Sequence, residues 1–388
     1  MPPTLADSSL AQAYYMKETT WGTIPALPLK AFRFTGESLK ANIARTESEE
    51  IRSDRQVTDL ITTRIGAGGD LNFELSHGAQ DDFLEGLLFD VFSADLGISA
   101  TDIDAAAADQ SFNTAGAVDF SAIQPGRWIK VAGFSNSANN GFFRVVSATA
   151  TKLIVSQGDF ALVNEAAGPT VTMQGKNLRN GTTKQSFTIE KRLTDVPQFI
   201  NYRGMRVASG NLNVEVGRPV GGAFAFLGKQ ELTAVATVGT GADVAAPTND
   251  VMNAVTSLQT VREAGVVSAF SYLSLALTIE NGLREQPAIG SAFNIGIGAG
   301  TMKVSGRLRA YFSGPALYDK FLNDTPTDLS LRFVDPSGKA YILSLLKMKF
   351  ATGQVLAAAR NQDVLADLTF TAFRDPTFGK TVQIDRFV

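Results

Sequence analysis

The sequence predicts a mainly β protein made of two tandem β-sandwich or split-barrel modules, each with one short flanking helix, and a small inserted all-β domain. Three observations support this fold class. The same order of strands and a helix occurs twice along the chain, and a segment of different composition interrupts the first copy. In addition, the 26 Phe and 35 Gly among 388 residues favour sheets joined by turns.

The first copy contains a strand that leads into a short acidic helix. Apolar and polar residues alternate over 71–76, and an apolar stripe at helical spacing follows over 81–91. The stripe predicts that one helix face is buried, whereas its three acidic side chains are left for solvent: Asp81, Asp82 and Glu85.

The second copy repeats this order without interruption. Residues 302–309 form a predicted strand, a Ser-Gly-Pro turn leads into a helix at 316–322, and the next strand at 329–333 follows closely. In the first copy the matching strand, 187–190, lies much farther along the chain, which an insertion explains. A tandem duplication of one β-rich unit is typical of rings and arrays, because each unit presents the same edges to its neighbour.

Changes of composition set the predicted boundaries. The insert is rich in Ala, Asp, Ser and Asn with turn signals such as Pro125-Gly126, and the linker is a run of small residues around Pro247. The segments are an N-terminal arm at 1–31, the first part of module 1 at 32–96, the inserted all-β decoration domain at 97–183, the second part of module 1 at 184–232, the linker at 233–265, and module 2 with the C-terminal tail at 266–388.

Two long connections occupy the same place in the two copies, at 44–60 and 280–300. The first predicts a hairpin whose charged tip projects from the body, and long loops of this kind are commonly functional. Interleaved charges of both signs indicate a subunit interface rather than a nucleic-acid patch. The interface candidates are Glu49, Glu50, Arg52, Asp54, Arg55, Arg284 and Glu285.

The overall charge argues against tight nucleic-acid binding, because a net charge of −3 provides no positive field to neutralise phosphates. The chain has no Cys, so disulfides, thiolate nucleophiles and Cys-ligated metals are excluded. The first residues lack the apolar region of a secretory signal, and no apolar run is long enough to span a membrane.

No catalytic, cofactor-binding or metal site is predicted, and the chain is not expected to be an enzyme. Asp81 and Asp82, with Glu85 a turn later, could act as paired carboxylates, but a solvated helix start is favoured because neighbouring positions point to different sides of a helix. His77 is the sole histidine and is expected to be a loop residue. The glycine runs at 66–69 and 296–300 precede strands rather than helices, which excludes phosphate-loop motifs.

Several segments of module 1 resemble the tail tube proteins, or major tail proteins, of long-tailed and non-contractile bacteriophages. The resemblance begins at 37–39 and 48–56, continues through 74–76 and 81–86, and includes the later strands at 187–191 and 199–228. Module 2 is similar only in pattern, and the insert resembles a general Ig-like or SH3-like decoration. The resemblance implies a structural virion protein, made in the host cytoplasm, that self-assembles into stacked rings forming a conduit for DNA.

The resemblance also implies partners. Two modules in one chain predict trimeric rings with pseudo-six-fold symmetry; the alternative is a hexamer with the second module outside. Other phage tail proteins, namely the tape measure, terminator and distal tail proteins, are expected to bind the tube, and DNA is only passing cargo. No cofactor and no membrane insertion are expected. The competing hypothesis is a carbohydrate-binding or adhesive surface protein that uses the domain at 97–183.

Strand alternation suggests which side chains line the bore of such a tube. Residues that face away from the apolar side of their sheets include three acidic candidates, Glu74, Glu215 and Asp367. Lys303 and Arg307 share that pattern, so the predicted surface is not uniformly negative. Strand continuity at both ends of the insert places the decoration domain on the outer wall.

Overall fold

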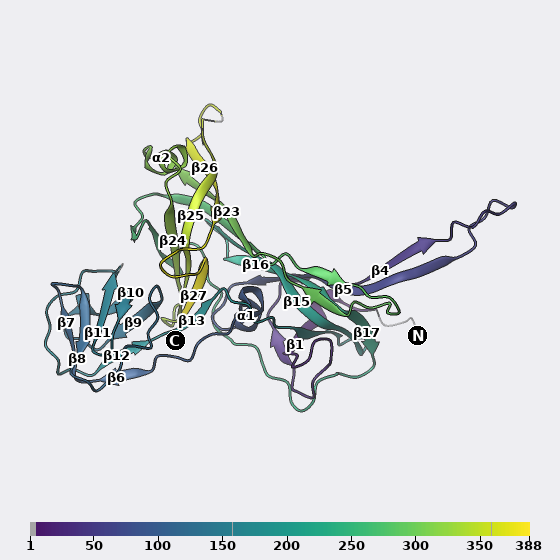
Figure 1. Ribbon diagram of the computed structural model, residues 1–388, viewed down its shortest axis with the longest axis horizontal. Helices are drawn as coiled ribbons and strands as arrows, with labels where there is room; N and C mark the ends of the chain where they lie inside the picture. Colours follow the sequence, from purple (N-terminus) through teal and green to yellow (C-terminus); the bar gives the residue numbers. More distant parts are fainter. Residues whose placement is uncertain (1–4, 157, 358) are drawn as a thin grey trace.

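A computed structural model describes residues 5–156, 158–357 and 359–388, so residues 1–4 of the predicted arm lie outside the described residues. The described chain is mainly β, with 27 strands and two α-helices. Figure 1 shows three parts: the strands of the first module around α1, those of the second module above them, and a separate set of strands, β6 to β12, at one end of the long axis.

The first module is a sheet that bends into two layers. Its strands pair in the order β4-β5-β16-β15-β14, and α1 packs against β15. Its elements are β3 (Gly36–Glu37), β4 (Lys40–Glu47), β5 (Leu60–Glu74), α1 (Asp81–Leu88), β14 (Phe187–Leu193), β15 (Gln198–Glu215) and β16 (Gly221–Gly228).

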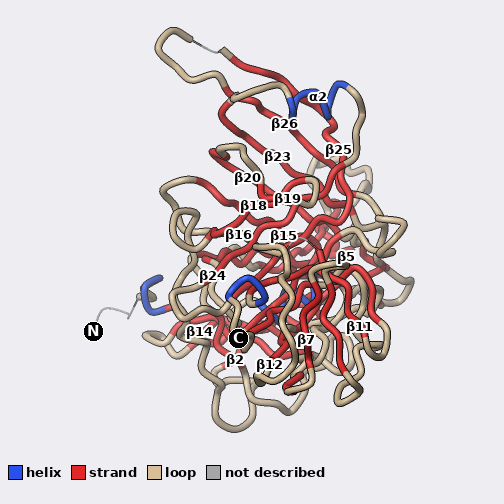
Figure 2. The backbone as a smooth tube through the Cα atoms, turned by 90° about the vertical axis from the view of Figure 1, so that its left-hand side faces the viewer, coloured by secondary structure: helices blue, strands red, loops and turns tan. Residues whose placement is uncertain are grey.

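The second module repeats this arrangement. Its strands pair in the order β20-β23-β26-β25-β24, and α2 lies over β25 and β26 (Figure 2). Its elements are β20 (Tyr272–Glu280), β23 (Lys303–Tyr311), α2 (Ala316–Leu322), β24 (Thr327–Val334), β25 (Ala340–Leu356) and β26 (Leu365–Ala372). The two halves of the chain therefore share one topology.

The likeness extends to single residues. The long strand of each module is interrupted at the same place, by a bulge at Ala208 in β15 and at Ala351 in β25. Gly69 in β5 and Gly306 in β23 also correspond, since each pairs with a Phe next to the bulged segment. A Cβ on either would lie 2.3 Å from a backbone carbonyl oxygen, of Ser38 or of Ala276. Equivalent bulges and equivalent close approaches are expected of a duplicated unit.

The two modules are joined edge to edge in one sheet. The C-terminal half of β15 pairs with β16 on one side and with β20 on the other, so β20, the first strand of module 2, continues the sheet of module 1. Seven consecutive residue pairs form this internal seam, from Ser209 opposite Glu280 to Glu215 opposite Ser274.

The acidic side chains of α1 are not left for solvent, so that expectation is wrong. Glu85 is only 8% exposed, and β1 and β27 bring basic and hydroxyl groups over the helix. Lys17 forms ion pairs with Asp82, at 2.7 Å, and with Glu85. The Arg386 Nε lies 3.0 Å from Asp81. The opposite face packs into the core as predicted, with Phe83 fully buried.

The predicted N-terminal arm is ordered against the chain's own first module. β1 pairs along its whole length with β14 and also with β2, and Tyr15 and Met16 are buried. This layer consists of η1 (Ser8–Leu10), β1 (Ala11–Lys17), β2 (Lys30–Phe32) and β17 (Gln230–Ala234). Tyr15 becomes part of the core because β1 lies between β2 and β14, and β14 is far away in the chain.

The predicted linker also contains structure. β18 pairs with β24 and so adds a strand to module 2, and Met252 is fully buried. β18 spans Leu258–Glu263. Beyond the linker lie β19 (Val266–Val267) and a small hairpin of β21 (Arg284–Gln286) and β22 (Gly296–Gly298).

Residues 98–174 form a separate seven-stranded sheet with its own core. Its strands are β6 (Ile98–Ala100), β7 (Ile103–Ala106), β8 (Ser111–Thr114), β9 (Trp128–Ala132), β10 (Gly141–Ala148), β11 (Lys152–Ser156) and β12 (Val171–Gln174), with η2 (Ser137–Asn139) between two of them. The next strand, β13 (Lys176–Arg179), pairs instead with β27 (Val382–Phe387) of the large sheet, although it lies within the range 97–183.

The seven-stranded sheet packs on the second module, although the chain inserts it into the first. Trp128 and Phe142 contact Ile342 and Phe387 across the interface, and the Trp128 Nε1 donates a hydrogen bond of 3.1 Å to the Ser344 hydroxyl. The contact surface consists of β24, β25 and β27, with ion pairs from Arg144 to Asp328 and from Arg332 to Asp159.

Candidate functional site

A continuous polar face crosses both modules. Cross-strand pairing places Asn213 of β15 opposite Ala276 of β20, which in turn lies opposite Arg307 of β23 and then Thr369 of β26. Because side chains alternate along strands, these residues lie on one side of the sheet, opposite the apolar core. The face includes the exposed or half-exposed residues Asn72, Glu74, Asn211, Asn213, Glu215, Arg307, Arg309 and Thr369.

Glu74 and Glu215, two of the predicted bore residues, lie close together on this face. Both line an open hollow that also includes Arg218. Glu215 is half exposed and lies 3.4 Å from the Arg218 guanidinium, an exposed ion pair of the kind that contributes little to stability. The hollow therefore carries two carboxylates and one guanidinium that are accessible from outside the sheet.

Asp367, the third predicted bore residue, lies on the same face but is covered. Its carboxylate forms a two-pronged ion pair with Arg307 and lies 3.9 Å from Arg309. Hydrogen bonds from Arg307 hold the pKa of Asp367 below its usual value. Two guanidiniums therefore surround one carboxylate, so this cluster of the second module carries a net positive charge.

The hairpin of β4 and β5 projects from the body, opposite the seven-stranded sheet (Figure 1). The five candidates at its tip, Glu49, Glu50, Arg52, Asp54 and Arg55, are all exposed. Arg52 donates two hydrogen bonds to Asp54, of 2.9 and 2.7 Å. The tip therefore presents charged groups of both signs well away from the rest of the chain.

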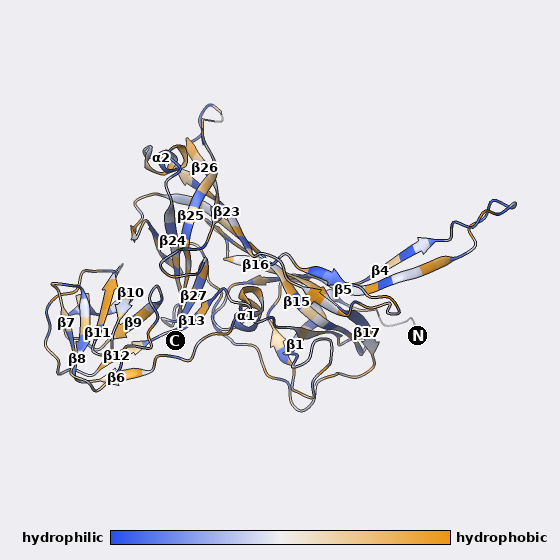
Figure 3. Ribbon diagram, viewed as in Figure 1, coloured by the Kyte–Doolittle hydropathy of each residue, from blue (hydrophilic) through white to orange (hydrophobic). Residues whose placement is uncertain are grey.

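The same hairpin also exposes large apolar side chains. Ile51 is 98% exposed, and Val57, Leu60 and Ile61 are each about half exposed; Figure 3 shows the hydrophobic residues on the projecting part of β5. Apolar side chains gathered on a protruding element indicate a contact surface for another protein molecule. Sequence analysis did not select these apolar residues, because the charged residues around them dominate the composition of the segment.

The second long connection folds back onto the base of the first. Ile65 donates a backbone hydrogen bond of 2.7 Å to Ala292, and Arg64 forms an ion pair with Glu285 at 2.8 Å. Glu285 is thus committed to an internal contact. Arg284 is exposed, and its guanidinium donates to the Ala299 carbonyl.

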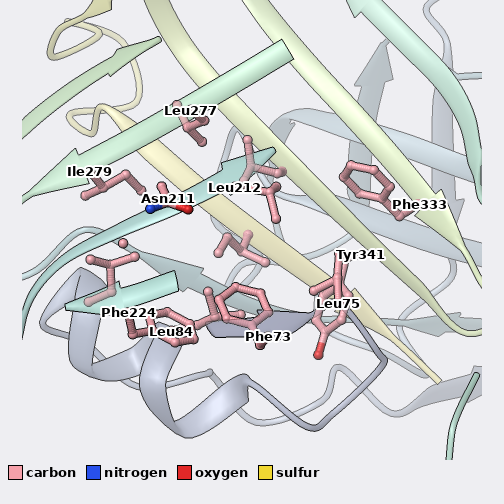
Figure 4. A pocket seen from close by; sticks show the side chains of 14 residues that line it. Phe73, Leu75, Leu84, Asn211, Leu212, Phe224, Leu277, Ile279, Phe333 and Tyr341 are labelled. Atoms are coloured by element: carbon pink, nitrogen blue, oxygen red, sulfur yellow. The ribbon is translucent and has the colours of Figure 1, made fainter. Parts of the chain in front are cut away.

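A small cavity of about 50 Å³ lies where the two modules meet. Figure 4 shows that Phe73, Leu75, Leu84 and Phe224 of module 1 face Leu277, Phe333 and Tyr341 of module 2 around it. The lining is almost entirely apolar. Because these side chains belong to the main core cluster, the cavity is a packing defect between the modules rather than a reaction site.

The residues considered for chemistry have structural roles. The Asp81 and Asp82 carboxylates are held by ion pairs; burial opposes ionisation of Asp82, but hydrogen bonds from Lys17 and Lys30 outweigh it and lower its pKa. His77 is a loop residue, as expected, but it is buried with its ring 5.0 Å from that of Tyr341. Within the described residues, no group of three or more His, Cys, Asp or Glu is placed to hold a metal ion.

Sequence reasoning expected edges shared between neighbouring units but did not identify which strands carry them. β4 pairs with β5 on one side, and the C-terminal half of β25 pairs with β26 on one side; within the described chain neither has a strand on its other side. The equivalent edges, of β20 and β15, are paired with each other. The bulges at Ala208 and Ala351 show which strand edges are equivalent. Bulges cannot be recognised in a sequence, so the open edges could not be assigned before the structure.

Comparison with known proteins agrees with this architecture. None of the described helices is long and apolar enough to cross a membrane, and a search of curated proteins finds no similar sequence. A family model described as phage tail tube protein matches residues 8–372, which include both modules, the insert and the linker. The chain therefore belongs to the phage tail tube protein family, and it is a structural protein of the virion tail.

Proposed function

We propose that this tail tube protein self-assembles into rings that stack into a tube, through which DNA passes during ejection into the host. The observation that carries the proposal is the strand order. Two like modules join through β15 and β20 and leave the equivalent edges open at β4 and β25. Open edges expose unpaired backbone groups, and a closed ring of modules satisfies them.

The ring is proposed to be a trimer with pseudo-six-fold symmetry. The second module lies beside the first in one continuous sheet, which is the relation that neighbouring modules of a six-module ring need. A hexamer with the second module outside would require this module to leave the sheet. The internal seam therefore favours three chains per ring over six.

The polar face is proposed to line the bore, with Glu74, Glu215 and Asp367 among its residues. Half-exposed Glu74 and exposed Glu215 would repel phosphates weakly, and the pairing of Asp367 with Arg307 would partly neutralise the arginines of the second module. Such a surface lets DNA slide without strong binding. The seven-stranded sheet packs on β24, β25 and β27, away from this face, which supports its position on the outer wall.

The projecting hairpin is proposed to join one ring to the next, through its exposed charges and through Ile51 and Val57. At the two ends of the tube the same surfaces would meet other tail proteins, namely the terminator and distal tail proteins, and the tape measure protein would occupy the bore. Arg284 and Glu285 lie at the base of the hairpin, where they would position it.

Negative-stain electron microscopy of the purified full-length chain tests the proposal. Rings or tubes with a central hole are expected, either spontaneously or after concentration. Particles that remain monomers at high concentration, and that bind immobilised glycans through residues 97–183, would support an adhesive function instead.

A further inference from the structure

We infer that β25 of one copy of this chain pairs with β4 of the next copy, antiparallel, with Val355 opposite Leu39. The inference rests on the proposed ring assembly and adds the strands and the register of the seam between chains. It follows from the seam that the chain already forms inside itself, where β15 of the first module pairs with β20 of the second.

The duplicated pairings fix which residues correspond. The bulges equate Ala208 with Ala351, so Leu212 of β15 corresponds to Val355 of β25. Gly69 and Gly306 are equivalent.

The pairing of β4 with β5 and of β20 with β23 then shows which residues of β4 and β20 correspond. Lys40 lies opposite Gly68, and Thr278 lies opposite Ser305. Because Gly68 and Ser305 each precede one of the equivalent glycines, Lys40 corresponds to Thr278, and Leu39 to Leu277.

The internal seam can therefore be transferred to the edges that remain open. Inside the chain, Leu212 lies opposite Leu277 and Asn211 lies opposite Thr278. The equivalent pairs between two copies are Val355 with Leu39 and Gln354 with Lys40.

The backbone groups at the edge next to β4 point in the directions that this register needs. In the internal seam the Asn281 N–H donates to the Ala208 carbonyl, at 2.9 Å, and alternate residues from there on bond across the seam. Just before β4, the Ser38 N–H bonds inward to the Asp70 carbonyl. The Leu39 N–H and carbonyl therefore point away from β5, where they bond to the Glu37 carboxylate and the Tyr202 hydroxyl of their own chain. The proposed pairing with Val355 replaces these two bonds.

The side chains match on both faces of the proposed seam. Gly353 and Val355 would lie beside Ala41 and Leu39 on the core side, as Gly210 and Leu212 lie beside Ile279 and Leu277 within the chain. On the other side the exposed residues Thr352 and Gln354 would meet Lys40 and Asn42, extending the polar face. A slip of one residue would exchange the two faces, so the pattern selects this register.

Disulfide trapping tests the register directly, because the chain has no cysteine of its own. Gln354 and Lys40 would form a non-hydrogen-bonded pair, in which side chains are close. The single variants Lys40→Cys and Gln354→Cys, mixed, assembled and oxidised, are expected to give covalent dimers on a non-reducing gel. The double variant Lys40→Cys/Gln354→Cys is expected to give larger covalent oligomers.

Two matched variants serve as controls. Asn211→Cys/Thr278→Cys places cysteines on the equivalent internal pair and should form a disulfide within one chain, whether or not the chain assembles. Lys40→Cys/Val355→Cys shifts the register by one residue, so its side chains would lie on opposite faces and should not be linked.

The outcomes separate the seam from the proposed function. Rings or tubes that form without cross-linking of Lys40→Cys and Gln354→Cys would overturn the seam and leave the tube proposal standing. Cross-linking of the shifted pair instead would overturn the register. Chains that neither assemble nor cross-link, while the internal pair does, would contradict both proposals.

Discussion

Single residues in this protein show how a duplicated fold is built from different side chains. Gly69 and Gly306 are identical because a backbone carbonyl of the adjacent chain segment, at Ser38 or Ala276, occupies the space of a side chain in both modules. The residues that precede them, Gly68 and Ser305, differ because they meet no such common constraint. The sequence therefore keeps a trace of the duplication where the backbones approach closely.

Gly306 provides a test of this close approach. We expect Gly306→Ala to destabilise the chain by about 1–3 kcal/mol, the usual cost of forcing an extra carbon into a packed site, because its Cβ would lie 2.3 Å from the Ala276 carbonyl oxygen. Gly314→Ala is the matched control, since no atom lies within 4 Å of the added carbon. Chemical denaturation measures both; equal stability of the two variants would contradict the packing described.

His77 should titrate far from the usual range. Burial, together with the nearby Arg386 guanidinium, lowers the pKa of His77 to about 4, whereas the unfolded chain binds this proton near pH 6.5. The unfolded state therefore binds more protons between these values, and this contribution to stability is lost as the pH falls from about 6.5 to about 4.

The titration can be followed by NMR of isotope-labelled histidine, because the chain has only one. Arg386→Gln should raise the pKa of His77, since it removes a neighbouring positive charge. A wild-type pKa near 6.5 would show that the ring is exposed to water and not packed on Tyr341.

Secondary-structure elements were predictable to different degrees. The two helices and the strands that follow them could be read from the sequence, because their apolar periodicity is local. β1 and β18 could not, since each is a single strand whose partners, β14 and β24, lie far away in the chain. Of the candidate site, the hairpin tip was readable from charge, but the burial of Asp367 depends on arginines from a neighbouring strand.

The seven-stranded sheet should be removable. Its two connections lie together: Leu96 donates a backbone hydrogen bond of 3.3 Å to Gly175. We expect deletion of 97–174 to preserve folding and assembly but to lower the Tm, because Ile342 and Phe387 lose the cover of Trp128 and Phe142.

A longer deletion, of residues 97–183, is compared with the deletion of residues 97–174. It also removes β13, the partner of β27, so it should be markedly less stable than the shorter one. Circular dichroism during heating and electron microscopy measure both. An unfolded product of the shorter deletion would contradict the independence of the inserted sheet.

The hairpin should be needed for stacking but not for closing a ring. Replacing residues 48–59 by an Asn-Gly turn keeps β4 and β5 paired and removes the exposed tip with Ile51 and Val57. We expect isolated rings in place of tubes in electron micrographs. Ile51→Ser, which changes one exposed side chain, should shorten tubes; tubes of normal length from the truncated chain would show that other surfaces stack the rings.

The molecule as a whole consists of two similar modules that lie side by side in one continuous sheet. The internal seam joins two modules by strand pairing, and the open edges at β4 and β25 are the same surfaces one repeat further on. A chain of this kind carries within itself the geometry of its contact with the next copy. In the proposed assembly, tube formation would need no element beyond those already present in the two modules and their hairpin.

A cross-section of the assembled particle by cryo-electron microscopy tests this account most directly. We expect six similar modules, supplied by three chains, around an open channel lined by the polar face that includes Glu74 and Glu215. A six-chain ring with the second modules outside, or a particle without a channel, would contradict it.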